Sequence, residues 1–430
     1  MRGQGLVSAS ARARRPTRSD GLIAVVHSGG VRLSSDVPVK PPRRVVVLGA
    51  TGSIGSSTLK VVARHVDRFR IAALTAGRQA EALDRLAACW DPDYVVLADG
   101  ADRPQGDQWN GQWRYGRDEV KRAAADPSIP IVVNALVGFA GLESTLAALE
   151  AGKRLALANK ESLVVGGELV LEAAAAGGGE LLPVDSEHSA ILQCLGDRPT
   201  AEVSRVILTA SGGPFRDWPA DRFAAIRPED ALAHPTWSMG DKISVDSATL
   251  ANKALEVIEA HLLFGLDFDR IDVVVHPASI VHSMVEFRDG STVSQLGYPT
   301  MEVPILFALS APERLSNEFR AFDPVGASPL EFERLRREDF PMFELGVAAG
   351  RSGGTAPAVY NAANEVAVRA FLSGRLSFSG IPKLVEMALS TMPATPVESL
   401  EHLVSVDAEA RSRSIESVGT QPATGGEKTP

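Results

Sequence analysis

Residues 44–55 read Arg-Val-Val-Val-Leu-Gly-Ala-Thr-Gly-Ser-Ile-Gly. The first five residues are typical of a buried strand, and Gly49, Gly52 and Gly55 have the spacing of a tight turn that leads into a helix. Such a turn lets the backbone approach a pyrophosphate, and the N-terminus of the helix offers unpaired N–H groups to it. An ordinary strand-to-helix loop is the alternative for this motif alone, but the pattern of the residues that follow favours a dinucleotide site.

Short β-rich runs alternate with helical patterns along the next hundred residues. Strands are predicted at 69–74, 94–97, 131–134 and 154–158, and helices at 56–65 and 80–89. This alternation indicates right-handed βαβ units and a mostly parallel sheet. We therefore expect an α/β chain whose first domain, residues 43–184, is a Rossmann-like nucleotide-binding domain.

The end of the second predicted strand indicates which nicotinamide cofactor the domain takes. A site specific for NAD usually carries Asp or Glu there, which accepts a hydrogen bond from the ribose 2′-hydroxyl. This chain instead has Gly77, Arg78 and Gln79. A carboxylate would repel a 2′-phosphate, whereas an arginine can pair with it. The pattern predicts NADPH, although an arginine on the surface is as often simply solvated.

The regular alternation of predicted strands and helices changes after Pro183. Strands are predicted at 205–209, 272–275 and 291–295, and from about residue 340 apolar positions recur only at helical spacing. We expect a central α+β catalytic domain at 185–310, a linker at 311–336 and a C-terminal helical domain at 337–418.

Asp185 and Glu187 follow a strand-like, apolar pair of leucines. On an extended backbone, alternate residues point to the same side, so both carboxylates could share one cation. Oxygen ligands without cysteine favour Mg²⁺ or Mn²⁺ over Zn²⁺. A solvated pair of acids is the commoner explanation of so short a motif.

A helix capped by residue 246 or 247 is predicted to end near residue 265. Within it, Asn252, Lys253 and Glu256 fall within an arc of ~100° and form a polar stripe that could bind an anion and a metal. The alternative is a Lys253–Glu256 ion pair on a solvated helix face, and this segment alone favours that alternative.

Two loops between these segments have the composition of a ligand site. Ser211 opens a glycine-rich turn, residues 211–215, whose hydroxyl and N–H groups could cradle a phosphate. The segment 234–242 begins with His234-Pro and contains Trp, Met and Gly240, which suits a mobile flap that excludes water. Trp and Met are more often core residues, and His188, His276 and His282 can equally be structural.

Composition excludes several classes of protein. The chain has 430 residues, 45% hydrophobic and 23% charged, as in an ordinary globular protein rather than a disordered or fibrous one. A net charge of −9 argues against general nucleic-acid binding, and no apolar run reaches the ~18 residues that cross a bilayer. Two cysteines are too few for a disulfide framework, so we expect a reducing compartment, the cytoplasm.

Both ends of the chain differ from the rest. Residues 1–42 hold six arginines against two acids and lack the apolar core of a secretory signal. A disordered arm, an organelle transit peptide and a start codon placed too far upstream are the alternatives. Residues 419–430 are polar, and we expect them to form a disordered tail.

These segments, in this order, resemble the 1-deoxy-D-xylulose 5-phosphate reductoisomerase family, which uses NADPH and a metal in non-mevalonate isoprenoid biosynthesis. The resemblance runs from about residue 44 to beyond 400. Besides the segments above, it rests on residues 159–161, 183–188, 244–256, 276–284 and 361–365. It implies rearrangement and reduction of a phosphorylated ketose, 1-deoxy-D-xylulose 5-phosphate, to 2-C-methyl-D-erythritol 4-phosphate, usually by a homodimer. The alternatives are an NADPH-dependent sugar-phosphate oxidoreductase without rearrangement and a non-catalytic NADPH-binding protein.

The resemblance also implies roles for individual residues. Metal ligands would be Asp185, Glu187 and Glu256, holding Mg²⁺ or Mn²⁺, with Co²⁺ as a further candidate. The substrate phosphate would contact Ser211, Ser247, Asn252 and Lys253, and the carbon chain would contact Ser186, His234 and Lys160, the last two also being catalytic. Cofactor contacts would be Thr51, Gly52, Ser53, Ile54, Gly77, Arg78, Gln79, Asn159, Glu161 and Gly240. Arg78-Gln79 stands where many members have Lys-Asn, a change that keeps the cation.

Overall fold

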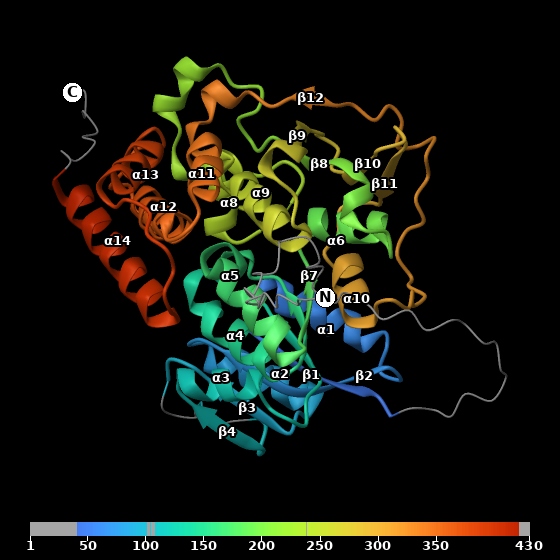
Figure 1. Cartoon of the computed structure of the whole chain (residues 1–430). Helices are drawn as coiled ribbons and strands as arrows, with labels where there is room; N and C mark the ends of the chain where they lie inside the picture. Colours follow the sequence, from blue (N-terminus) through green and yellow to red (C-terminus); the bar gives the residue numbers. More distant parts are fainter. Residues whose placement is uncertain (1–40, 101–103, 105–107, 238, 421–430) are drawn as a thin grey trace, which may run out of the picture.

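A computed structural model describes residues 41–100, 104, 108–237 and 239–420 (Figure 1). The predicted leader therefore lies outside the described residues, apart from residues 41 and 42. The last helix, α14, spans Leu400–Thr420, so it includes residues 419 and 420, the first two of the predicted tail. The rest of the tail lies outside the described residues.

The first sheet has seven parallel strands in the order β4-β3-β2-β1-β5-β6-β7. The strands are β1 Arg43–Leu48, β2 Phe69–Ala76, β3 Tyr94–Leu97, β4 Gln112–Tyr115, β5 Ile131–Asn134, β6 Arg154–Leu157 and β7 Glu180–Pro183. The helices are α1 Ser53–Ala63, α2 Ala80–Trp90, α3 Arg117–Ala124, α4 Leu142–Glu150 and α5 Lys160–Gly177, with the 3-10 turn η1 at Gly138–Gly141. The expectation of a Rossmann-like parallel sheet is confirmed. The strand order reverses between β1 and β5, and ligands bind at the carboxyl ends of strands beside such a switch point.

A second sheet lies in the middle of the chain, in the order β11-β10-β8-β9-β12. Its strands are β8 Val203–Ala210, β9 Ile271–Val275, β10 Val281–Phe287, β11 Thr292–Leu296 and β12 Glu333–Arg334. β8 and β9 are parallel, and the other pairs are antiparallel. β12 lies within 311–336, the segment predicted to be a linker. It is a strand because its backbone pairs with β9.

Helices cover this sheet and continue into the C-terminal part (Figure 1). They are α6 Ser186–Leu195, α7 Pro228–Leu232, α8 Asp241–Thr249, α9 Ala251–Phe264, α10 Glu302–Ser310, α11 Pro341–Ser352, α12 Ala356–Leu372 and α13 Gly380–Thr391, followed by α14. Short 3-10 turns occur at η2 Thr200–Glu202, η3 Ala220–Ala225, η4 Phe268–Arg270 and η5 Arg337–Asp339. One hydrophobic core joins β8, β9 and α9 to α11, α12 and α13, so the central and C-terminal parts pack as a unit.

The helix predicted to be capped by residue 246 or 247 is wrong in its start, whereas its predicted end near residue 265 is confirmed, because α9 ends at Phe264. α8 already begins at Asp241, and α9 follows it after Leu250, which has a φ of 62°. Leu250 is buried in the core beneath both helices, and this packing holds a leucine in a conformation that it otherwise avoids. The break redirects α9, which carries the polar stripe.

α10, for which no helix was predicted, packs on the first sheet. Its apolar face, with Ile305 and Leu309, belongs to the core on one side of the first sheet, together with Val45 and Val47 of β1. Figure 1 shows α10 beside α1, and the two helices are in contact. The segment expected to be the catalytic domain, 185–310, therefore ends in a helix that packs on the first sheet. No helix in the described ranges is long and apolar enough to cross a membrane.

Candidate active site

A cavity of about 540 Å³ opens at the carboxyl ends of the first sheet. Its walls come from the loops that follow β1, β5, β6 and β7, from the turn after β8, and from the segment that includes α8 and the start of α9. The switch point of the parallel sheet thus faces the central domain across this cavity. Every residue predicted to bind substrate or metal lines it: Lys160, Asp185, Ser186, Glu187, Ser211, His234, Ser247, Asn252, Lys253 and Glu256.

The three predicted metal ligands lie together. Asp185, Glu187 and Glu256 each offer a carboxylate oxygen, and these oxygens lie within 4.8 Å of one another. The carboxylates of Asp185 and Glu187 are only 10% and 17% exposed, so the alternative of a solvated pair of acids does not apply.

The geometry that brings Asp185 and Glu187 together differs from the prediction of an extended segment. The chain turns into α6 directly after Asp185, which is the N-cap residue, and Glu187 lies in the first turn of the helix. The positive end of the helix dipole therefore faces both carboxylates, which favours their negative charge.

Two buried lysines face the three carboxylates. The Lys160 ammonium lies 3.0 Å from Glu256 Oε1, pairs with Asp185 and donates to Asn252 Oδ1. Lys253 pairs with Glu256 and lies 3.5 Å from Glu187 Oε1. The Lys253–Glu256 ion pair of the alternative interpretation therefore exists, but both side chains are buried rather than solvated.

The cluster holds more acidic than basic groups, and the pKa values reflect this. Burial, together with the negative charges of Glu256 and Asp185, raises the pKa of the Glu187 carboxyl to about 8 against the attraction of Lys253. Burial also disfavours the charge of Asp185, but the attraction of Lys160 lowers the pKa of that carboxyl below its usual value. An all-oxygen donor set of three carboxylates fits a hard divalent cation.

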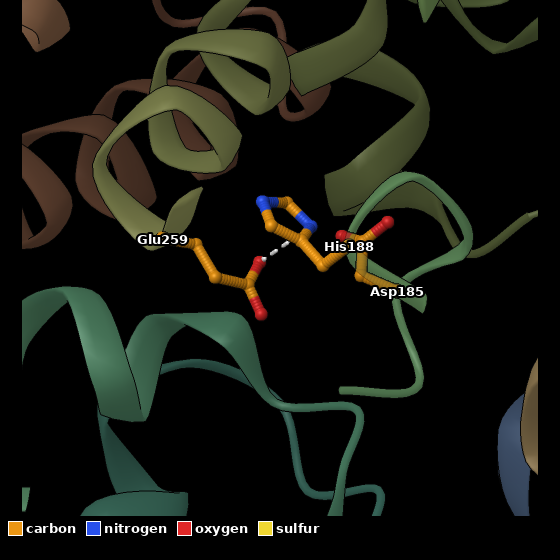
Figure 2. A group of neighbouring side chains, drawn as sticks. All are labelled: Asp185, His188 and Glu259. Carbon is orange, nitrogen blue, oxygen red and sulfur yellow. Dashed lines mark ion pairs between the residues drawn. The ribbon is translucent and has the colours of Figure 1, made fainter. Parts of the chain in front are cut away.

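A second buried pair lies behind the carboxylates (Figure 2). His188 of α6 and Glu259 of α9 are fully buried, and His188 Nδ1 lies 3.3 Å from Glu259 Oε2. His188 Nε2 lies 2.8 Å from the backbone oxygen of Glu256, so the ring connects α6 to the turn that carries a predicted ligand. Glu259 was not predicted from the sequence as a residue of the site. The only indication in the sequence is its position one helical turn after Glu256.

The phosphate-binding turn meets the flap at Ser211. Backbone N–H groups of Thr236 and Trp237 donate to His234 Nδ1, at 3.2 and 3.0 Å, so the proton of the ring lies on Nε2. Nε2 then donates to Ser211 Oγ at 3.0 Å. Gly213 has a φ of 69°, and a Cβ there would lie 2.7 Å from the backbone oxygen of Ser247, so only glycine lets this turn approach α8.

The predicted cofactor residues fall into two groups. Gly52, Ser53, Ile54, Glu161 and Gly240 line the cavity, whereas Thr51, Gly77, Arg78, Gln79 and Asn159 are outside its lining. Gly77, Arg78 and Gln79 directly follow β2, the neighbour of β1, so they lie farther along the same edge of the sheet.

Asn159 stabilises the loop after β5 at this edge of the sheet. Its amide donates to the backbone oxygens of Leu136 and Gly138, at 2.9 and 3.0 Å, and its side-chain oxygen caps α5. It therefore shapes the loop after β5, part of which lines the cavity.

Lys242 is a residue of the cavity that the sequence analysis did not single out. Its ammonium lies 2.9 Å from Glu161 Oε1 and 2.7 Å from Asp246 Oδ2. Asn364 of α12 donates to the other oxygen of Asp246, at 2.8 Å. The C-terminal part thus contacts a residue of the cavity through a buried hydrogen bond. Asn364 lies in the segment 361–365, which resembles the family but to which no function was assigned from the sequence.

Comparison with known proteins identifies relatives along most of the chain. Sequence models described as 1-deoxy-D-xylulose 5-phosphate reductoisomerase, its C-terminal domain, and DXP reductoisomerase C-terminal domain match residues 45–167, 181–264 and 296–413. The 1-deoxy-D-xylulose 5-phosphate reductoisomerase of Xanthomonas oryzae pv. oryzae (strain PXO99A) is 52% identical over 376 residues, which cover 86% of this chain and 95% of the relative. That of Thermosynechococcus vestitus is 46% identical over 394 residues, or 89% and 94% of the two chains.

Solved structures of similar proteins agree with these sequence matches. The enzyme from Zymomonas mobilis in complex with NADPH is 41% identical, with a TM-score of 0.81 over 88% of this chain and 100% of its own. A DOX-P reductoisomerase in complex with NADPH, fosmidomycin and magnesium is 38% identical, with a TM-score of 0.82 over 88% and 98%.

Proposed function

The chain belongs to the 1-deoxy-D-xylulose 5-phosphate reductoisomerase family, and from this premise we propose that it converts 1-deoxy-D-xylulose 5-phosphate to 2-C-methyl-D-erythritol 4-phosphate. The reaction uses NADPH and a divalent cation. The observation that carries this proposal is the convergence of Asp185, Glu187 and Glu256 in a cavity that the glycine turn after β1 also lines.

The three carboxylates fit Mg²⁺ or Mn²⁺, with Co²⁺ as a further candidate. When bound, such an ion supplies a Lewis acid that polarises the ketone and orients the neighbouring hydroxyl. Lys160 and Lys253 surround the same carboxylates and hold them in place by ion pairs. A solved relative is described as a complex with magnesium, in agreement with this donor set.

A further set of cavity residues is proposed to hold the substrate phosphate. Ser211, Ser247, Asn252 and Lys253 all line the cavity, where hydroxyl, amide and ammonium groups can surround the phosphate oxygens. The Nε2–H of His234 orients the Ser211 hydroxyl, and the flap that begins at His234 excludes water above it. A phosphate held in this way keeps the rearranged aldehyde in the site until its reduction.

NADPH, when bound, supplies the hydride that reduces this aldehyde. Gly52, Ser53 and Ile54 place the N-terminus of α1 against the cavity, where free N–H groups can bind the pyrophosphate. Arg78 at the end of β2 is the candidate partner of the 2′-phosphate. Relatives described as NADPH complexes support this choice of cofactor.

We also propose that the chain is a homodimer and works in the cytoplasm. Cys89 and Cys194 are unpaired, which suits a reducing compartment. Light scattering of the purified protein would measure the mass of the assembly, and a monomer would contradict the first of these proposals.

The decisive experiment measures the oxidation of NADPH by its absorbance. Turnover is expected only with both 1-deoxy-D-xylulose 5-phosphate and Mg²⁺ or Mn²⁺, and excess chelator should abolish it while NADPH remains bound. NMR of the product should show a branched carbon skeleton. Turnover that survives the chelator would contradict the proposal, and an unbranched product would identify an oxidoreductase without rearrangement.

A further inference from the structure

At the outer end of the nucleotide-binding edge, Arg78 belongs to a charged group with Asp99 and Arg117, two residues to which no role has been assigned. Arg78 follows β2, Asp99 follows β3, and Arg117 opens α3 directly after β4. Because these parallel strands are neighbours, their carboxyl ends bring the three side chains together.

The two arginines contact different oxygens of one carboxylate. Arg117 Nε donates to Asp99 Oδ1 at 3.0 Å, whereas Arg78 Nε lies 3.8 Å from Asp99 Oδ2. The hydrogen bond from Arg117 lowers the pKa of the Asp99 carboxyl, so Asp99 is charged at neutral pH. Arg117 therefore holds this carboxylate firmly, and Arg78 is only loosely paired and 83% exposed.

The charges decide what this group can bind. With Arg78 alone, the Asp99 carboxylate would cancel the cation, and an incoming phosphate would meet no net positive charge. Arg117 changes the sum of these three groups to one positive charge and occupies the acidic oxygen nearest to it. The carboxylate of Glu143 on α4 also attracts Arg117, but more weakly than Asp99 does. The guanidinium of Arg78 is then available for a phosphate dianion, to which arginine binds through paired N–H groups.

The stability of helix α3 does not explain why an arginine occupies position 117. It stands at the N-terminus of the helix, where the dipole disfavours a cation, while Asp118 and Glu119 of the same turn suit that end. The side chain is 76% exposed and contributes little burial. Its position is therefore unfavourable for the helix and favourable only for the charges at the edge of the sheet.

We propose that Arg117 is a second determinant of the preference for NADPH over NADH, acting by neutralising Asp99 and by attracting the 2′-phosphate. This proposal rests on the proposed function, because it concerns the cofactor of the same site. It extends the predicted 2′-phosphate contact from the single residue Arg78 to a pair of arginines on neighbouring strand ends.

Calorimetric titration of the full chain with NADPH and with NADH tests this without substrate or metal. Arg117→Gln should weaken NADPH binding roughly tenfold, as expected for one charge-assisted hydrogen bond, and leave NADH binding unchanged. Arg117→Lys, which keeps the charge, should retain most of the preference. The matched control is Arg122→Gln on the same helix, because Arg122 pairs with Glu119 instead of Asp99.

Equal weakening of NADPH and NADH binding in Arg117→Gln, no weakening of either, or an equal loss in Arg117→Lys would overturn the proposal. The outcome is separate from that of the proposed function. A chain that fails to turn over the ketose phosphate but loses its NADPH preference in Arg117→Gln would refute only the function.

Discussion

Glu256 shows how burial gives a single side chain its chemistry. Its carboxylate is 2% exposed and contacts Lys160, Lys253 and Asn252. A buried carboxylate is costly unless charges and hydrogen bonds compensate it, and here two ammonium groups do so. The remaining acidic excess of the cluster is what a divalent cation would neutralise.

Replacing Glu256 by Gln should therefore remove one metal ligand and one negative charge while keeping the shape of the side chain. We expect metal-dependent turnover to fall roughly a hundredfold or more, since even groups behind a ligand are worth 10–100-fold. NADPH binding should persist because the glycine turn is untouched. Initial rates over a range of Mg²⁺ concentrations and a fluorescence titration with NADPH measure the two effects.

The matched control is Glu172→Gln, an exposed acid on α5, which should behave as the unmodified protein. Activity of Glu256→Gln close to that of the unmodified protein would remove Glu256 from the set of ligands.

At the scale of elements, the contact of α12 with α8 connects the C-terminal part to the cavity. Asp246 of α8 is buried and receives a hydrogen bond from Asn364 and an ion pair from Lys242. Lys242 also holds Glu161 at the start of α5. One side chain of α12 thus helps to set the position of two elements that line the site.

Replacing Asn364 by Leu should leave one oxygen of Asp246 without its donor. The cost of an unsatisfied buried carboxylate is about 1–3 kcal/mol, so thermal unfolding should begin several degrees lower. Circular dichroism during heating measures the shift. In the same domain, Lys383→Ala changes an exposed residue of α13 and should alter the unfolding temperature little.

An unchanged melting temperature for Asn364→Leu would mean that the α12–α8 hydrogen bond contributes nothing to stability.

At the scale of the whole molecule, α10 fastens the middle of the chain to the first sheet. Ile305 is fully buried in the core that includes β1 and the indoles of Trp109 and Trp113. The chain therefore leaves the nucleotide-binding part at β7, builds the second sheet, and returns to cover the first sheet with α10 (Figure 1).

Replacing Ile305 by Ala should destabilise the first sheet although the residue lies far along the sequence from it. Loss of a buried isoleucine costs about 2–5 kcal/mol, through lost burial and a residual cavity. Urea unfolding followed by tryptophan fluorescence should show the first transition at lower urea. Ile415→Ala, at a position 56% exposed on α14, serves as the control.

A fluorescence transition at the same urea concentration in Ile305→Ala and in the control would show that α10 is not part of this core.

The patterns of short segments predicted much of this structure. The strand, glycine turn and helix at β1 and α1 depend on neighbours in sequence, and so does the alternation that makes the first sheet parallel. These local features are set by interactions within a few residues. The carboxylates were only weak candidates from their own segments, and the resemblance to the family was what singled out Asp185, Glu187 and Glu256 together.

Tertiary packing decided the rest. Leu250 breaks a helix that its own propensity would continue, and β12 pairs from within an apparent linker. α10 packs on the first sheet, whose last strand already ends at Pro183. None of these features has a local signal. The same holds for Glu259 behind the carboxylates and for Asn364 beside Asp246. Such positions are determined by which apolar faces remain to be covered and which buried charges need a partner, and those requirements exist only once the chain has folded.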